Sequence, residues 1–123
     1  MIRIDLEMLI FLHDNEIRDE EDPHIKNKSL LLSAINNPYQ TAFGVDLYPT
    51  NELKISMMVF SIIRNHGFND GNKRTGIKVL QTLLDDCDIE LNATEEDYIQ
   101  LALDIVNHYE KEDIVNWINR HRI

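Results

Sequence analysis

Apolar residues recur at helical spacing along most of the chain, and this pattern predicts an all-α fold. The first such segment covers residues 6–13 and the second covers residues 30–35. Asn36-Asn37-Pro38 is expected to end the second segment, because a proline pushes the residue before it out of helical geometry. The first third of the chain therefore predicts two helices.

The middle of the chain predicts two longer helices that meet at a tight turn. Thr50 is a suitable N-cap for the first, which extends to about Arg64 and is apolar on nearly every side, so we expect it to be buried. After the turn Asn69-Asp70-Gly71, the second helix should run over residues 72–86. The side chains expected to face inward from it are Ile77, Leu80, Leu83 and Leu84.

Two more helices are predicted towards the C-terminal end. Thr94 and Asp97 form a capping-box pattern, with Asp in place of Glu, ahead of apolar residues at helical spacing. Glu112 and Asp113 suit the N-terminus of a last helix, where negative charge is favoured by the helix dipole. Residues 89–91 are a candidate short strand. The whole pattern predicts a compact bundle of about six helices.

Two connecting segments differ in composition. Residues 14–22, the acidic segment, hold six acids and one arginine ahead of Pro23. We expect it to be a solvated loop that contributes to solubility, rather than a binding element. Residues 39–50 contain Gly44 and Pro49 among aromatic and β-branched residues, which predicts an irregular or hairpin-like flap before the long central helix.

Composition and charge narrow the class of protein. With 123 residues, 43% of them hydrophobic and 28% charged, the chain is expected to form one domain, residues 1–123. A net charge of -10 argues against broad or sequence-specific binding of nucleic acid. Cys87 is the single cysteine, so no intrachain disulfide can form. We see no signal peptide or membrane span and therefore expect a cytoplasmic protein.

One region reverses the sign of the charge. Residues 54–78 hold five basic residues against the single acid Asp70, a local charge of +4 in an anionic chain. A cationic patch of this size favours a small polyanion, such as a nucleoside triphosphate, over a nucleic-acid polymer. Chance clustering of lysine and arginine on a solvated helix face is the alternative.

The segment His66-Gly67-Phe68-Asn69-Asp70-Gly71-Asn72-Lys73-Arg74-Thr75 lies inside this region and combines a helix end, a polar loop and a helix start. Free backbone amides at a helix N-terminus bind anions, and Gly71 lets the backbone approach a phosphate closely. Asn72, Lys73 and Arg74 are expected to add donors there. Arg74 can hold a phosphate through two parallel hydrogen bonds, whereas Lys73 acts as a mobile point charge.

Two further residues of this segment have chemistry that suits phosphate transfer. Asp70 is placed to hold a magnesium ion, and the imidazole of His66 can take a proton from a hydroxyl. Taken singly, each has an ordinary structural explanation, with His66 as a helix C-cap, Asp70 as an N-cap and Gly71 as a turn residue. Together they favour a catalytic site, because capping requires neither a histidine nor three consecutive phosphate-type donors.

The pattern His66-x-Phe68-x-Asp70-Gly71-Asn72-Lys73-Arg74 resembles the signature loop of the Fic/Doc family. Lys73, where the Fic branch has glycine, is similar to the Doc (death-on-curing) toxin branch. Leu12-His13 and Tyr48-Pro49-Thr50 also look like Doc proteins. The resemblance implies a compact all-α bundle in which the loop joins two central helices.

The resemblance also implies roles for individual residues. His66 would be the catalytic base, Asp70 the Mg²⁺ ligand, and residues 71–74 the site for the phosphates of ATP. Fic enzymes transfer AMP to a protein hydroxyl, whereas the best-known Doc toxin phosphorylates a threonine of elongation factor Tu and halts translation. Lys73 and Ile77, which stands where many Fic enzymes have a second arginine, favour the kinase activity.

The same resemblance bears on partners. Family members are restrained by an inhibitory helix with a Ser/Thr-x-x-x-Glu-Gly/Asn pattern, and this chain has no such pattern. The expected partners are therefore a separate, Phd-like antitoxin that carries the inhibitory helix, and a protein substrate. Two alternatives stay open: a Fic-type AMP transferase, and a non-catalytic binding module with the same fold.

Overall fold

The computed structural model describes all residues 1–123 and has six α-helices with one small hairpin. The elements are α1 (Leu6–Glu16), α2 (Lys28–Asn36), the 3₁₀ turn η1 (Asn37–Tyr39), β1 (Thr41–Ala42), β2 (Val45–Asp46), α3 (Asn51–Asn65), α4 (Asn72–Asp86), α5 (Glu95–Asn107) and α6 (Lys111–His121). The prediction of an all-α bundle of about six helices is confirmed.

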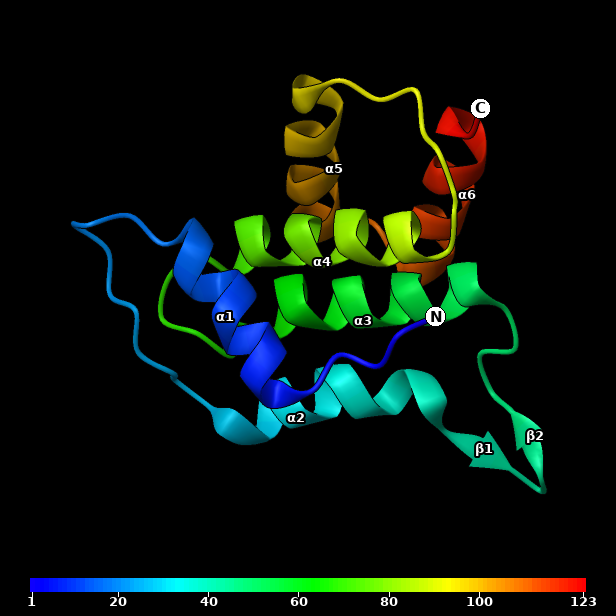
Figure 1. Ribbon diagram of the computed structural model, residues 1–123, viewed down its shortest axis with the longest axis horizontal. Helices are drawn as coiled ribbons and strands as arrows, with labels where there is room; N and C mark the ends of the chain where they lie inside the picture. The colour runs from blue at the N-terminus through cyan, green and yellow to red at the C-terminus, as the bar shows by residue number, and fades with distance from the viewer.

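Helices α3 and α4 form the centre of the molecule and run antiparallel, side by side (Figure 1). Helix α1 crosses α4, α2 packs on α3, and α5 and α6 stand across the central pair on the side opposite α2. The turn between α3 and α4 lies at the same end of the molecule as the segment between α1 and α2. The fold therefore brings residues 17–27 to the signature loop.

One hydrophobic cluster of 22 buried residues holds the bundle together. Helix α3 contributes the largest share, with Ile55, Met58, Val59, Ile62 and Ile63 at most 2% exposed. The expectation that a helix apolar on nearly every side is buried is confirmed. Ile77 is an exception among the residues expected to face inward from α4, because it is only half-buried and lines a surface groove. None of the six helices is long and apolar enough to cross a membrane.

Side-chain caps set the starts of most helices, as the sequence predicts. The Thr50 hydroxyl accepts a hydrogen bond from the Leu53 amide, and Thr94 and Asp97 form the predicted capping box. At the start of α6, which begins at Lys111, the Asp113 side chain accepts a hydrogen bond from the Glu110 amide at 2.8 Å. The candidate strand at residues 89–91 is reduced to an isolated bridge between Leu91 and Arg122.

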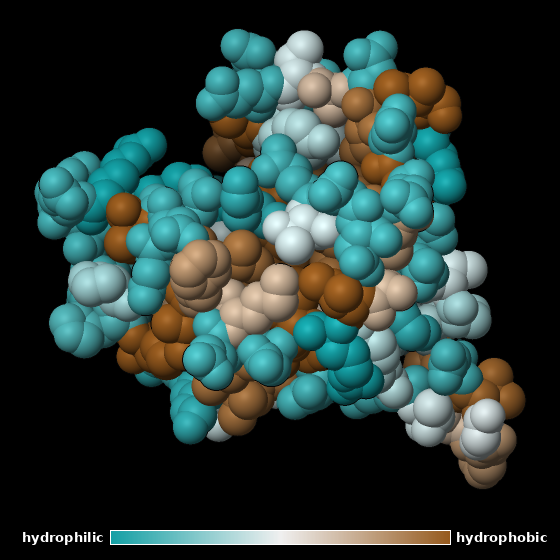
Figure 2. Space-filling view, viewed as in Figure 1, coloured by the Kyte–Doolittle hydropathy of each residue, from teal (hydrophilic) through white to brown (hydrophobic).

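The predicted flap is a two-stranded antiparallel hairpin. Its tip stands away from the body of the molecule and is apolar, with Phe43, Val45 and Leu47 exposed (Figure 2). The hairpin precedes α3 whereas the signature loop follows it, so the two lie at opposite ends of a 15-residue helix, about 22 Å apart. The hairpin therefore does not cover the loop.

Two of the five basic residues in the cationic region serve the fold. Lys54 donates to the Tyr48 carbonyl and pairs with Asp46 at 3.3 Å, which ties the hairpin to α3. Arg64 donates from Nη1 to the carbonyls of Ile105 and Tyr109 at 2.9 and 3.3 Å, and so satisfies the C-terminal end of α5. The cationic patch is therefore smaller than the sequence predicts, and its remaining members lie in the first half of α4.

The close approach of α3 and α4 depends on Gly76, and this contact is testable. A Cβ added at Gly76 would lie 2.4 Å from Ile63 Cγ1. Helix propensity alone favours Ala over Gly by about 0.5–1 kcal/mol, whereas overpacking costs about 1–3 kcal/mol. We expect Gly76→Ala to lower the free energy of unfolding in urea. The double variant Gly76→Ala/Ile63→Ala should lose less than the sum of the single variants. A stabilised Gly76→Ala protein would contradict this packing.

Candidate functional site

Residues 66–71, the part of the signature loop between α3 and α4, reverse the chain through two residues in left-handed geometry. His66 follows α3 with φ 52°, and Gly71 precedes α4 with φ 86°. Glycine adopts this conformation without strain, so it suits the second position. Gly71 is also the N-cap of α4, and it has no side chain to satisfy the first amides of the helix.

Asn72 locks the loop from inside. Its side chain is buried and makes two hydrogen bonds to the backbone of Phe68: Oδ1 accepts from the amide at 3.1 Å, and Nδ2 donates to the carbonyl at 2.8 Å. In this structure the Asn72 side chain supports the loop, and its role as a donor to the anion site stays a prediction. The amide and the carbonyl of Phe68 are buried, and each would cost free energy if it had no hydrogen-bond partner.

The amides at the start of α4 remain free. The backbone N–H groups of Gly71, Asn72, Lys73 and Arg74 donate to no acceptor in the chain, and the first bond of the helix runs from the Thr75 amide to the Gly71 carbonyl at 2.9 Å. Successive free amides at a helix N-terminus, together with the helix dipole, form an anion site. The backbone amides that the sequence predicts for an anion site are therefore unpaired in the structure, and anion binding by them stays a prediction.

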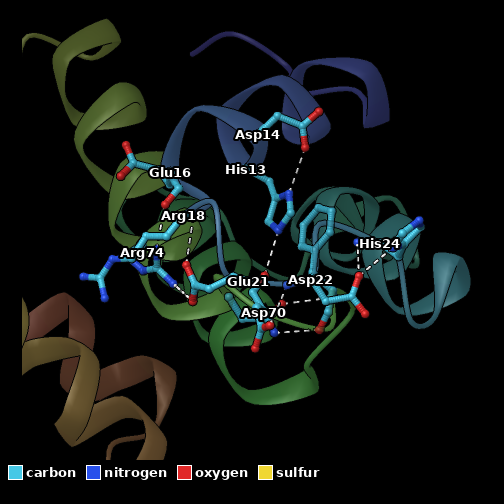
Figure 3. A network of polar contacts seen from close by, with 11 residues as sticks. His13, Asp14, Glu16, Arg18, Glu21, Asp22, His24, Asp70 and Arg74 are labelled. Atoms are coloured by element: carbon cyan, nitrogen blue, oxygen red, sulfur yellow. Dashed lines mark hydrogen bonds and ion pairs between the residues drawn. The ribbon is translucent and has the colours of Figure 1, made fainter.

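His13 on α1 packs against the loop from the other side. Its side chain is fully buried, its ring stacks on Phe68 with 3.7 Å between centroids, and Nε2 lies 2.7 Å from the Asp70 carbonyl oxygen (Figure 3). Nδ1 lies 3.1 Å from a carboxylate oxygen of Asp14. The sequence pattern placed His13 on the apolar side of the first helix, but gave no sign that it reaches the loop.

The chain that follows α1 also lies along the loop. The amides of Lys26 and Asn27 both donate to the Gly67 carbonyl, and the Asn69 amide donates to the His24 carbonyl at 3.0 Å. Asp22 accepts a hydrogen bond from the Asn69 side chain at 2.9 Å. Most of the acidic segment is exposed, as expected of a solvated loop, but Asp22 at its end also contacts the signature loop.

Arg74 is already paired within the chain. Its guanidinium donates to the Glu16 carbonyl from Nη1 at 2.7 Å, and to the Glu21 carboxylate from Nη2. The hydrogen bond with Arg74 lowers the pKa of the Glu21 carboxyl, and the same bond raises the pKa of the Arg74 guanidinium. Both groups are therefore charged at neutral pH. A phosphate that uses this fork must share Arg74 with Glu21 or displace it.

Asp70 has one carboxylate oxygen in use. Oδ2 accepts from the Asp22 amide at 2.9 Å, whereas no group in the chain bonds to Oδ1. No cluster of three His, Cys, Asp or Glu side chains is arranged to hold a metal ion. A lone carboxylate fits Mg²⁺, which keeps several waters and takes further oxygens from bound phosphates. Asp70 is therefore suited to a metal that arrives with a nucleotide.

His66 is exposed and forms no hydrogen bond within the chain. It lies at the end of α3, while Asp70, Gly71 and Arg74 contact α1 and the segment after it. Because the His66 side chain is exposed and unpaired, both of its ring nitrogens are accessible from solvent.

A groove of about 740 Å³ begins beside the loop, between α4 and α5. Lys73, Arg74 and Lys78 line its basic wall, and Ile99 and Leu103 of α5 are exposed on the opposite wall. The remaining lining residues are Glu16, Arg18, Ile77, Gln81, Glu95, Tyr98 and Ala102. The groove combines a basic wall with an apolar wall and suits an amphipathic, acidic segment.

Comparison with known proteins agrees with this geometry. Residues 3–84, which cover α1 to α3, the signature loop and most of α4, match the model of the Fic/DOC family. The chain belongs to the Fic/DOC family. It is also 33% identical over 89 residues to the protein named Toxin Doc from Mycolicibacterium smegmatis, a match that covers 72% of this chain and 67% of that relative. Members of this family are typically transferases that act on protein hydroxyl groups, and this relative is a toxin.

Within this Fic/DOC site, the sequence identified the residues of the loop but missed the ones that hold it. His13, Glu16, Glu21 and Asp22 all come from α1 and the segment after it. One signal was available, because six acids in residues 14–22 face a region of charge +4 later in the chain. Opposite charges of this size favour contact, but they do not specify which side chains pair.

The lock made by Asn72 is testable through stability. Asn72→Ala leaves the amide and carbonyl of Phe68 buried without partners, which costs about 1–3 kcal/mol of unfolding free energy. Asn116→Ala is the matched control, because Asn116 is exposed on α6 and its loss should change stability by less than about 0.5 kcal/mol. Chemical denaturation of both variants measures the difference. Equal stabilities would contradict the role given to Asn72.

Proposed function

We propose that this chain is the toxin of a toxin–antitoxin pair, and that it transfers the terminal phosphate of ATP to a protein hydroxyl. The target in this proposal is a threonine of a translation factor similar to elongation factor Tu, so that transfer halts translation in the cytoplasm. The observation that carries the proposal is the row of four free amides, Gly71 to Arg74, which follows Asp70 directly in a loop that begins at the exposed His66.

Each of these groups has a chemical role in the proposal. The amides of residues 71–74 bind and orient the phosphates of ATP, and Asp70 holds the accompanying Mg²⁺ through its free oxygen. When bound, Mg²⁺ neutralises charge on the phosphate oxygens. His66 takes the proton of the attacking hydroxyl as general base. Phosphate transfer needs mainly positioning and charge stabilisation, and a rigid loop supplies both.

Lys73 and Ile77 support phosphate transfer over AMP transfer. Lys73 is exposed in the first turn of α4 and adds a positive charge beside the free amides. Ile77 lies one turn further along, in the groove wall, so the chain has no second arginine at this place. The proposal is that the lysine side chain favours the pose in which the terminal phosphate faces the hydroxyl, because in-line transfer depends on the orientation of ATP.

The groove between α4 and α5 supports an antitoxin partner. Its basic wall of Lys73, Arg74 and Lys78 borders the phosphate site, and its other wall exposes Ile99 and Leu103. An acidic amphipathic helix from a Phd-like antitoxin would place its apolar face on the isoleucine and leucine side chains, and its carboxylates on the basic wall. A helix bound there would cover the entrance to the amides of α4.

The reaction is tested with ATP labelled at either the α or the γ phosphate. We expect the protein, incubated with Mg²⁺ and a translating extract, to label one protein from the γ position only. Label transferred from the α position would instead establish an AMP transferase, and label from neither position would favour a binding module.

His66→Asn provides the negative control, because asparagine tolerates the left-handed backbone at this position. We expect it to reduce transfer by about a hundred- to ten-thousandfold while ATP affinity stays close to wild type. His108→Ala is the matched control, since His108 is exposed at the end of α5 and should not affect transfer. A proportional fall in ATP affinity for His66→Asn would place His66 in the nucleotide site instead.

The pairing of Arg74 gives a second prediction about ATP. Glu21→Gln removes the carboxylate that competes with phosphate for the guanidinium, so it should tighten binding of MgATP by up to about fivefold, the range of exposed ion pairs. Glu20→Gln removes the same charge from a neighbouring exposed residue that has no ion pair. Calorimetric titration of both variants separates release of Arg74 from a general charge effect. Equal changes in the two would show that the pair does not compete with phosphate.

A further inference from the structure

We propose that His13 is a positioning residue for the phosphate site, which holds the Asp70 carbonyl and thereby turns the Gly71 amide towards a bound phosphate. This inference deepens the proposed function, because it rests on phosphate binding at the N-terminus of α4. It adds a residue from α1, 57 positions away from Asp70 in the sequence, to the machinery of the loop.

The hydrogen bond between His13 and Asp70 has only one possible direction. A carbonyl oxygen accepts and cannot donate, so Nε2 of His13 carries the hydrogen and donates it at 2.7 Å. The second ring nitrogen, Nδ1, faces the Asp14 carboxylate at 3.1 Å, outside the core. The ring therefore presents a donor to the loop in a defined orientation.

Peptide geometry transmits this orientation to Gly71. The peptide between Asp70 and Gly71 is planar and trans, so its C=O and N–H point in opposite directions. With the oxygen held towards His13, the Gly71 amide points away from His13, and no acceptor in the chain takes it. In the reversed orientation the carbonyl oxygen would face that side and repel a phosphate. Gly71 is a residue at which such a reversal is easy, because both signs of φ are open to glycine.

The surroundings of His13 leave its ring little freedom. The ring lies parallel to Phe68, with 7° between the planes, and Phe68 itself is fixed by Asn72. A Cβ added at Gly71 would lie 3.3 Å from His13 Nε2 and 3.2 Å from Ile17 Cδ1, so the loop rests directly on this side of α1. Rigid support of this kind keeps functional groups at productive distances.

A buried histidine can also act only by filling space, and two variants separate the explanations. Glutamine and methionine have side chains of similar length and volume, and both lose the aromatic stack on Phe68. Glutamine retains an N–H donor for the Asp70 carbonyl, whereas methionine has none. A space-filling role predicts equal effects of His13→Gln and His13→Met. A positioning role predicts that His13→Gln keeps the orientation of the Asp70 carbonyl and the affinity for MgATP, and that His13→Met loses both.

The primary experiment is a set of nucleotide-free crystal structures of the wild type and both variants. We expect the Asp70 carbonyl to point at residue 13 in the wild type and in His13→Gln, and to turn or lose its fixed orientation in His13→Met. Unchanged peptide orientation in His13→Met would overturn the proposal. This readout needs neither ATP nor transfer, so it stands even if the wild type binds no nucleotide, an outcome that would instead refute the proposed function.

Calorimetry with MgATP provides the functional arm. We expect His13→Met to weaken binding by about tenfold or more, the effect of one hydrogen bond to a charged group, and His13→Gln to stay within about threefold of wild type. In steady state the loss should appear in the KM for ATP rather than in kcat. Equal weakening by both variants would overturn the proposal. If His13→Met does not fold, a natively folded His13→Gln that has lost more than tenfold in ATP affinity would overturn it as well.

Discussion

The two hydrogen bonds between the Asn72 side chain and the backbone of Phe68 are the constraint on which the rest of the site depends. The chain reverses between two long antiparallel helices within six residues, so the peptide group at the middle of the turn is buried and needs partners. Asn72 supplies both. Phe68 is thereby held in the core as a platform for the His13 ring, and α4 begins with amides that no side chain caps. The packing of the turn and the open helix start thus depend on the same residue, Asn72.

Charge explains why the site needs a second set of contacts. The chain carries a net charge of -10, and a bare anion site in such a protein would be opposed by the surrounding carboxylates. The structure places one of those carboxylates, Glu21, on Arg74, and the Asp22 amide on Asp70. Residues 17–27 therefore contact the candidate site, although none of them belongs to the sequence motif at residues 66–74. Under the proposed function, nucleotide binding exchanges an internal carboxylate for a phosphate on the same guanidinium.

The accuracy of the sequence-based predictions follows the distance over which each interaction acts. Helix starts at Thr50 and Thr94 were predicted correctly, because a cap and its amide lie three residues apart. The burial of α3 was also predicted, because its apolar pattern is continuous along the helix. The predictions were incomplete where a partner comes from a distant segment. Arg64, counted as part of a cationic patch, satisfies the end of α5, and the acidic segment contacts the signature loop.

The sequence by itself determined the helices, their order and the loop that carries the family motif, because periodicity, caps and the motif are all local properties of the chain. It also determined the family through residues 66–74. Only the tertiary structure decided which donors of that loop remain free. The side chain of Asn72 is hydrogen-bonded to Phe68, and that of Arg74 is paired with Glu21. The backbone amides of residues 71–74 have no partner in the chain. The physical reason is that buried polar groups must find partners, and those partners are chosen by packing between segments far apart in the sequence.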